Sequence, residues 1–176
     1  MNTENQKIKN QKLMLKYHFP FLSDDVLHAL LMMAINFMGN RIPFMLVGSI
    51  AWKALGLPLN REIKNIDMEI ICDDEEKLSM FEEICKKQEG QSHVTEFNDD
   101  DDFGKLFVFT LFGVEFHIWV RDRKKGFYHK KFLTCGGIII PTVDEVIEIK
   151  MRNRRLKDLE DLLELNRIFY KNNTKN

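Results

Sequence analysis

Acidic and amide side chains alternate with apolar ones in two segments of the chain. Asn65, Asp67 and Glu69 fall on every second position of the first, and Glu115 and His117 do so in the second. This two-residue period is typical of a β-strand, so the polar side chains of each segment should share one face, about 6.6 Å apart. Carboxylates brought together there could bind a divalent cation. The alternative is that both sets simply form the solvent face of an antiparallel sheet.

A Gly-Ser pair, Gly48 and Ser49, lies between a short apolar run and a predicted helix from Ile50 to Leu55. Glycine at a strand-to-helix turn lets the backbone approach a ligand closely, and the free N–H groups that begin a helix suit phosphate. Such a pair on its own is more often an ordinary turn. The phosphate-binding interpretation therefore depends on neighbouring motifs.

The C-terminal region adds charged residues at helical spacing. Lys150 falls within an apolar stripe, where it would reach either an anionic group or, by extending along the surface, solvent. Arg154 with Asp158 and Lys157 with Asp161 are four residues apart, which predicts intrahelical ion pairs of about 0.3–0.5 kcal/mol each. Lys150 is thus the stronger candidate for a ligand contact.

Two further charged runs have less specific patterns. The basic segment Arg121 to Lys131 contains Phe127 and Tyr128, so it could grip an acceptor or a nucleotide by charge and stacking, or be a solvated loop. The run Asp99 to Asp102 lacks the spacing of a calcium loop and is interpreted as a hairpin turn.

The elements that must position these residues alternate between strand and helix only at the start of the chain. Ser23 caps a predicted apolar helix that ends at Gly39, and later strands follow one another in antiparallel pairs. This order favours an α+β fold with a mixed sheet flanked by helices over a doubly wound parallel sheet. We expect a single domain over residues 1–176, with a polar N-terminal segment 1–22 and C-terminal helices within 142–170.

Composition limits the partners and the compartment. The chain has 26 basic and 27 acidic residues, so no overall field draws it to nucleic acid or membrane. The longest apolar stretch, Val26 to Met38, is shorter than the roughly 20 residues that cross a bilayer. Three cysteines without paired or zinc-finger spacing argue against a disulfide framework. A cytoplasmic location without a membrane partner is expected.

Taken in order, these motifs resemble the nucleotidyltransferase fold of the DNA polymerase beta superfamily, especially its small bacterial branch of antibiotic nucleotidyltransferases and abortive-infection toxins. The resemblance covers roughly Phe44 to Leu163. LVGSIAWKALG is similar to the family's strand, Gly-Ser turn and helix, and REIKNIDMEI to its arginine followed by a DxD strand. VEFHIWV is similar to the late strand with a third acid, and RRLKDLEDL to a C-terminal run.

The resemblance implies that Gly48, Ser49, Arg61 and Lys150 contact nucleotide phosphates. The resemblance leaves two alternative sets of metal ligands, which differ in how the family's motif is aligned with this sequence. The first uses three acids as catalytic metal ligands and consists of Asp67, Glu69 and Glu115. The second keeps the family's distance from the arginine, replaces the first acid by a neutral amide, and consists of Asn65, Asp67 and His117.

Two functions are expected from these registers. With three acids, the chain would be a Mg²⁺-dependent nucleotidyltransferase that moves a nucleoside monophosphate from a nucleoside triphosphate to a hydroxyl of a small molecule, protein or RNA. Two ions about 3.5–4 Å apart would then neutralise the transferred phosphate. With Asn65, it would be a catalytically degraded member that binds a nucleotide or a partner protein in a regulatory role. The motifs do not specify the acceptor, which stays unknown.

Overall fold

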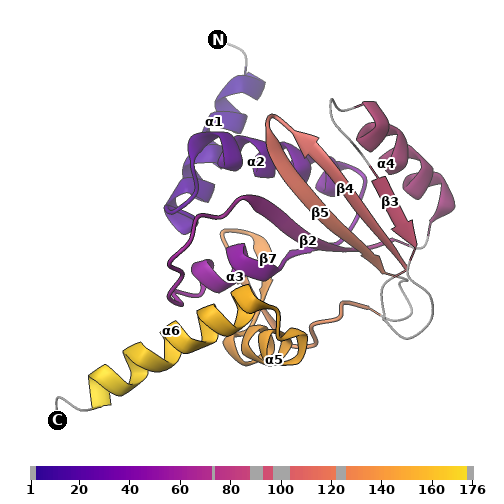
Figure 1. The fold of residues 1–176 in the computed structure, drawn as a ribbon. Helices are drawn as coiled ribbons and strands as arrows, with labels where there is room; N and C mark the ends of the chain where they lie inside the picture. The colour runs from indigo at the N-terminus through magenta and orange to yellow at the C-terminus, as the bar shows by residue number, and fades with distance from the viewer. Residues whose placement is uncertain (1–2, 73, 88–92, 97–103, 122–125, 174–176) are drawn as a thin grey trace.

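A computed structural model of the chain describes residues 3–72, 74–87, 93–96, 104–121 and 126–173. The described residues form an α+β fold, as the order of strand and helix signals predicts (Figure 1). The predicted hairpin turn at Asp99 to Asp102 lies outside the described residues. Six helices are present in these ranges: α1 (Thr3–His18), α2 (Asp24–Gly39), α3 (Gly48–Ala54), α4 (Glu75–Lys87), α5 (Val143–Asn153) and α6 (Leu156–Asn173).

In the part of the chain that the structure describes, seven strands form one mixed sheet in the order β3-β4-β5-β2-β1-β7-β6. The central pairs β2·β5 and β1·β7 are parallel, whereas β1·β2 and the outer pairs are antiparallel. The strands are β1 (Phe44–Leu46), β2 (Asn65–Ile71), β3 (His93–Glu96), β4 (Lys105–Leu111), β5 (Val114–Arg121), β6 (Phe132–Cys135) and β7 (Ile138–Pro141). The alternating segments of the sequence are thus the two neighbouring central strands, β2 and β5.

The main core lies between one face of this sheet and helices α1 and α2. Apolar side chains of β2 and β5 point into it, including Met68 and Ile118, which are fully buried. Helix α2 begins where Ser23 accepts a hydrogen bond from the Val26 N–H at 3.3 Å, as the capping signal predicts. Helix α1 is an element that the polar N-terminal sequence does not predict; Leu15 anchors it in the core. Burying this face leaves the polar side chains of β2 and β5 on the other.

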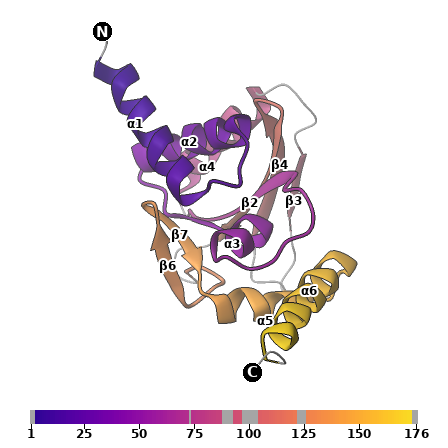
Figure 2. The same cartoon turned by 90° about the vertical axis from the view of Figure 1, so that its left-hand side faces the viewer.

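A smaller cluster joins α3 to α5 and α6, which lie at the end of the molecule away from α1 and α2 in both views (Figures 1 and 2). Helix α3 also contributes Ile50 and Ala51 to the main core. Trp52 of α3 is fully buried against Leu59 and Val146, and its indole N–H donates to the carbonyl oxygen of Pro58 at 2.6 Å. These contacts bring the C-terminal helices beside the Gly-Ser turn. Within the described residues, no helix combines the length and apolar character needed to cross a membrane.

Candidate functional site

The Gly-Ser turn lies directly against the polar face of β2. Gly48 has a φ of +64°, which a residue with a Cβ rarely adopts, and helix α3 begins there rather than at Ile50. A Cβ at this position would overlap Oδ2 of Asp67 and lie 3.1 Å from its Cβ. The backbone N–H of Val47 also donates to the carbonyl oxygen of Asp67 at 3.0 Å. Glycine is therefore required here by both conformation and space.

The register of β2 and β5 brings four predicted residues together. Asn65 is opposite Glu115, and Asp67 is opposite His117. The Asn65 amide donates to Oδ1 of Asp67 at 2.7 Å and lies 3.2 Å from Nδ1 of His117. The His117 Nε2 lies 2.9 Å from Oε1 of Glu115, a carboxylate that is 53% exposed. The cluster is half open to solvent.

His117 bridges the two carboxylates of this cluster. Its Nδ1 lies 3.2 Å from Oδ1 of Asp67, on the side of the ring opposite its contact with Glu115. The hydrogen bond to Asp67 raises the pKa of His117 against the effect of burial, and the charges of Asp67 and Glu115 add to it. When His117 is protonated, its imidazolium ring places a positive charge between the carboxylates of Asp67 and Glu115.

Glu69 shares the strand face but belongs to a separate contact. Its carboxylate is 1% exposed, lies 3.6 Å from Nε of Arg121 and accepts a hydrogen bond from the Tyr128 N–H. Burial raises the pKa of Glu69 to about 7, although the Tyr128 N–H and Arg121 oppose the rise. The three acids Asp67, Glu69 and Glu115 are therefore not gathered at one point, whereas Asn65, Asp67 and His117 are.

Arg61 and Lys150, predicted to contact phosphate, meet at a carboxylate of α6. Arg61 donates to Ser49 Oγ and to Oδ2 of Asp161, both at 2.8 Å, and Lys150 Nζ donates to the same Oδ2 at 2.7 Å. Lys150 also donates to Asp158 at 3.1 Å and lies 5.0 Å from the centre of a Trp52 ring. Lys150 thus reaches an anionic group within the protein, and this network ties α5 and α6 to the Gly-Ser turn.

The observed partners of these two aspartates differ from the predicted intrahelical pairs. Helix α5 ends at Asn153, and Arg154 adopts a left-handed conformation with a φ of +52°, so it does not share a helix with Asp158. Asp158 pairs instead with Arg155, three residues away, at 2.6 Å. Asp161 is buried and binds Arg61 and Lys150. The role of Asp161 thus depends on a contact with a distant segment, which helical spacing does not reveal.

The described part of the basic segment lies over the Glu69 end of the sheet. The Tyr128 ring has the guanidinium groups of Arg121 and Arg152 at 5.6 and 5.7 Å from its centre. Residues 122–125 of the segment lie outside the described residues. Its predicted role in gripping an acceptor or nucleotide stays a prediction.

Within the described residues, no group of three or more His, Cys, Asp or Glu side chains is arranged to hold a metal ion. The carboxylate of Asp67 nevertheless suits a Mg²⁺ ion that arrives with a nucleotide, because Mg²⁺ is often held by one or two carboxylates and the substrate phosphates.

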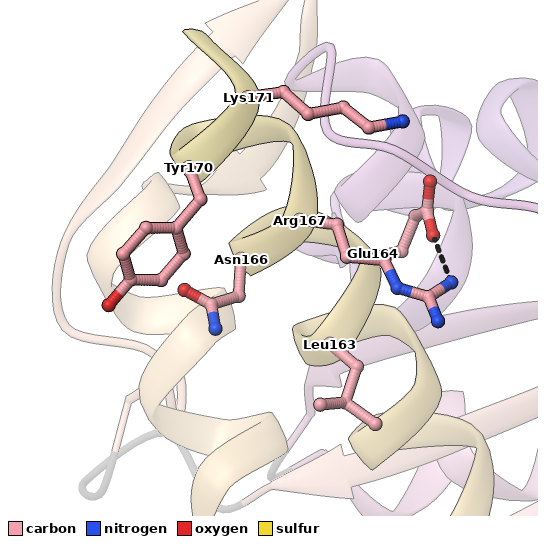
Figure 3. Close-up of a pocket in the computed structure, with 6 residues that line it drawn as sticks. All are labelled: Leu163, Glu164, Asn166, Arg167, Tyr170 and Lys171. Carbon is pink, nitrogen blue, oxygen red and sulfur yellow. Dashed lines mark ion pairs between the residues drawn. The ribbon is translucent and has the colours of Figure 1, made fainter. Parts of the chain in front are cut away.

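A hollow of about 420 Å³ lies elsewhere, on α6, where Leu163, Asn166 and Tyr170 line it with three charged residues (Figure 3).

Comparison with known proteins adds a distant similarity. No protein family model matches the chain, and no curated protein matches it. Among solved structures, it is similar to an antigenic nucleotidyltransferase-like protein from Paracoccidioides brasiliensis, with 13% identity and a TM-score of 0.46. The similarity covers 76% of this chain and 72% of the other. At this level it identifies neither a family nor an activity.

Proposed function

We propose that this protein is a nucleotidyltransferase-like nucleotide-binding module, in which a nucleoside triphosphate with Mg²⁺ binds beside Gly48 and Asp67. The close approach of Gly48 to the Asp67 carboxylate carries the proposal. The glycine backbone lets phosphate groups come close, and the adjacent carboxylate can bind the Mg²⁺ ion that accompanies them. Ser49 and Arg61, joined at 2.8 Å, would contact the outer phosphates. Helix α3 has only seven residues, so the attraction for phosphate comes from the side chains of Ser49 and Arg61 and not from the helix dipole.

The arrangement of the acids favours binding over rapid transfer. Two-metal transfer relies on ions held close together by several carboxylates. Here Asn65 contributes a neutral amide, and Glu69 is occupied by Arg121 and Tyr128. The catalytically degraded role, with a nucleotide or a partner protein as ligand, is therefore the leading candidate.

Magnesium-dependent transfer of a nucleoside monophosphate to a hydroxyl acceptor is the second candidate. The observation in its favour is Glu115, a half-exposed carboxylate on the strand next to Asp67. In this role Asp67 and Glu115 would hold Mg²⁺, which would neutralise charge on the transferred phosphate. Lys150 contacts phosphate in this candidate only by leaving Asp158 and Asp161.

Calorimetric titration with each of the four common nucleoside triphosphates, with and without Mg²⁺, tests the proposal. We expect Mg²⁺-dependent binding that Asp67→Asn weakens by about tenfold or more, because the carboxylate ligand is lost. Glu69→Gln is the matched control on the same strand and should retain binding. Binding that survives Asp67→Asn, or no binding by the wild type, would overturn the proposal. Loss of binding in Glu69→Gln would restore the three-acid register.

A pyrophosphate-release assay separates the two candidates. The degraded role predicts nucleotide binding without pyrophosphate release, whether or not hydroxyl acceptors are added. Mg²⁺-dependent release that disappears in Glu115→Gln would instead establish transfer. His117→Gln is an informative companion, because it removes the imidazole between the two acids while leaving both acids in place.

A further inference from the structure

Arg61 lies on a segment of the chain that is neither helix nor strand. Residues 55–64 join α3 to β2, and Arg61 lies near the end of this segment. Its guanidinium donates to Ser49 Oγ and to Oδ2 of Asp161, both at 2.8 Å. Connecting segments are more mobile than the elements that they join unless they are anchored. The position of Arg61 therefore depends on what anchors residues 55–64.

Trp52 anchors this segment through three contacts. Its indole N–H donates to the carbonyl oxygen of Pro58 at 2.6 Å, and its carbonyl oxygen accepts a hydrogen bond from the Leu57 N–H at 3.2 Å. Leu59 is buried with Trp52 in the smaller apolar cluster, and Trp52 is 0% exposed. Arg61 follows only two residues after Leu59, so these contacts fix the chain close to the guanidinium.

Trp52 also reaches the groups on either side of the Arg61 guanidinium. Ser49 lies three residues earlier on α3, so the two side chains are neighbours on the helix surface. The Lys150 ammonium lies 5.0 Å from the centre of a Trp52 ring, where the ring face attracts a cation. Lys150 donates to the same oxygen of Asp161 as Arg61 does. Trp52 thus connects the helix of Ser49, the segment of Arg61 and the ammonium group of Lys150.

We infer that Trp52 is a positioning residue that gives the nucleotide site its preference for a triphosphate. The inference rests on the proposed function, in which Ser49 and Arg61 contact the outer phosphates. By holding the Pro58 carbonyl, the indole N–H keeps the guanidinium facing the Ser49 hydroxyl before a nucleotide arrives. Such preorganisation raises affinity, because fewer groups must be ordered on binding. A nucleoside monophosphate has no outer phosphates, so it gains nothing from this pair.

Calorimetric titration with two nucleotides in the presence of Mg²⁺ tests this role. One is the nucleoside triphosphate that the wild type binds most tightly, and the other is the monophosphate of the same base. Trp52→Phe keeps an aromatic ring but removes the N–H donor, so we expect it to weaken triphosphate binding by about fivefold or more and monophosphate binding by less than about twofold. Equal weakening of both would overturn the inference, because Trp52 would then support the site only through packing.

Ser23→Ala is the matched control for the loss of one hydrogen bond. Ser23 accepts from the Val26 N–H at 3.3 Å at the start of α2, outside the anchored segment. This variant should bind both nucleotides as the wild type does, and circular dichroism spectra would establish that both variants fold. If Trp52→Phe does not fold, benzothienylalanine at position 52 replaces the N–H by sulfur in a ring of nearly the same shape, and the same titrations decide.

The Arg61→Gln background connects the effect to the phosphate contact. The guanidinium is absent there, so adding Trp52→Phe should weaken triphosphate binding by no more than about twofold further. An undiminished loss in this background would contradict a role that acts through Arg61.

A double-mutant cycle in urea provides a measurement without nucleotide. If Trp52 holds Arg61, the joint effect of Trp52→Phe and Arg61→Gln on the unfolding equilibrium constant should fall short of the product of the single effects by about threefold or more. Independent effects would refute the positioning role. A wild type that binds no nucleotide would refute the proposed function and the triphosphate preference with it, whereas the cycle shows separately whether Trp52 holds Arg61.

Discussion

Replacing Gly48 with alanine perturbs the contact between the Gly-Ser turn and Asp67 in two ways. The left-handed φ of +64° costs a residue with a Cβ about 1–2 kcal/mol. The new Cβ also overlaps Oδ2 of Asp67, and its 3.1 Å separation from the Asp67 Cβ limits how far that side chain can turn away. Moving Asp67 disrupts its contacts with Asn65 and His117, worth about 1 kcal/mol each.

We therefore expect Gly48→Ala to lower the free energy of unfolding by about 3–4 kcal/mol in total. Gly56→Ala is the matched control, because Gly56 has a similar φ of +75° but nothing within 4 Å of its added Cβ. Its cost should be the backbone contribution alone, about 1–2 kcal/mol. Urea denaturation followed by circular dichroism, with linear extrapolation to zero urea, measures both values.

A double-mutant cycle with Asp67→Ala then isolates the contact. Without the carboxylate, the cost of Gly48→Ala should fall to that of Gly56→Ala, which gives a coupling free energy of about 2 kcal/mol. Equal costs for the two glycine variants, together with a coupling near zero, would refute the close approach of Gly48 to Asp67.

Three further predictions concern the neighbouring charges. Asp161→Asn should lower the free energy of unfolding by about 3–5 kcal/mol in urea, because Arg61 and Lys150 lose the buried negative charge that they share. The control Glu164→Gln should cost under about 1 kcal/mol, and equal losses would contradict the network. Glu69 has a pKa of about 7 in the folded protein against an ordinary 4.5, so its stabilising contribution is full below pH 4.5 and lost as pH rises through 7. This loss is about 3 kcal/mol, and Glu69→Gln should remove it from the pH profile of stability; an unchanged slope would contradict the shift. Asn65→Asp restores a carboxylate beside Asp67, so Mg²⁺ should raise its melting temperature more than that of the wild type in calorimetry, and equal shifts would count against a metal at this position.

The alternation of polar and apolar residues was sufficient to predict the central strands and their polar faces. Asp67 and His117 lie on those faces because a half-buried strand must turn its apolar side chains to the core. The α+β class follows from the same pattern combined with the order of the helices. Helix α1 was missed because its sequence is mostly polar and its burial depends on the packing of α2.

The sequence could not separate Glu69 from Asp67. Strand periodicity assigns a side chain to a face but does not say which later segment covers it. Tyr128, almost sixty residues further along, covers Glu69, while Asp67 stays beside the glycine turn. The role of Asp161 could not be predicted from the sequence either. Its partner Arg61 is 100 residues away, and helical spacing indicated Lys157 as a nearer partner.

If the proposed triphosphate binds beside Ser49, it would compete with Asp161 of α6 for Arg61. Arg61 and Lys150 both donate to Oδ2, so one atom anchors α6 through two cations. A triphosphate that recruits Arg61 would leave Asp161 with Lys150 alone and loosen the attachment of α6. Binding of a triphosphate at the glycine turn would then increase the mobility of α6 at the C-terminal end of the chain. By the same coupling, immobilising α6 would weaken binding of the triphosphate.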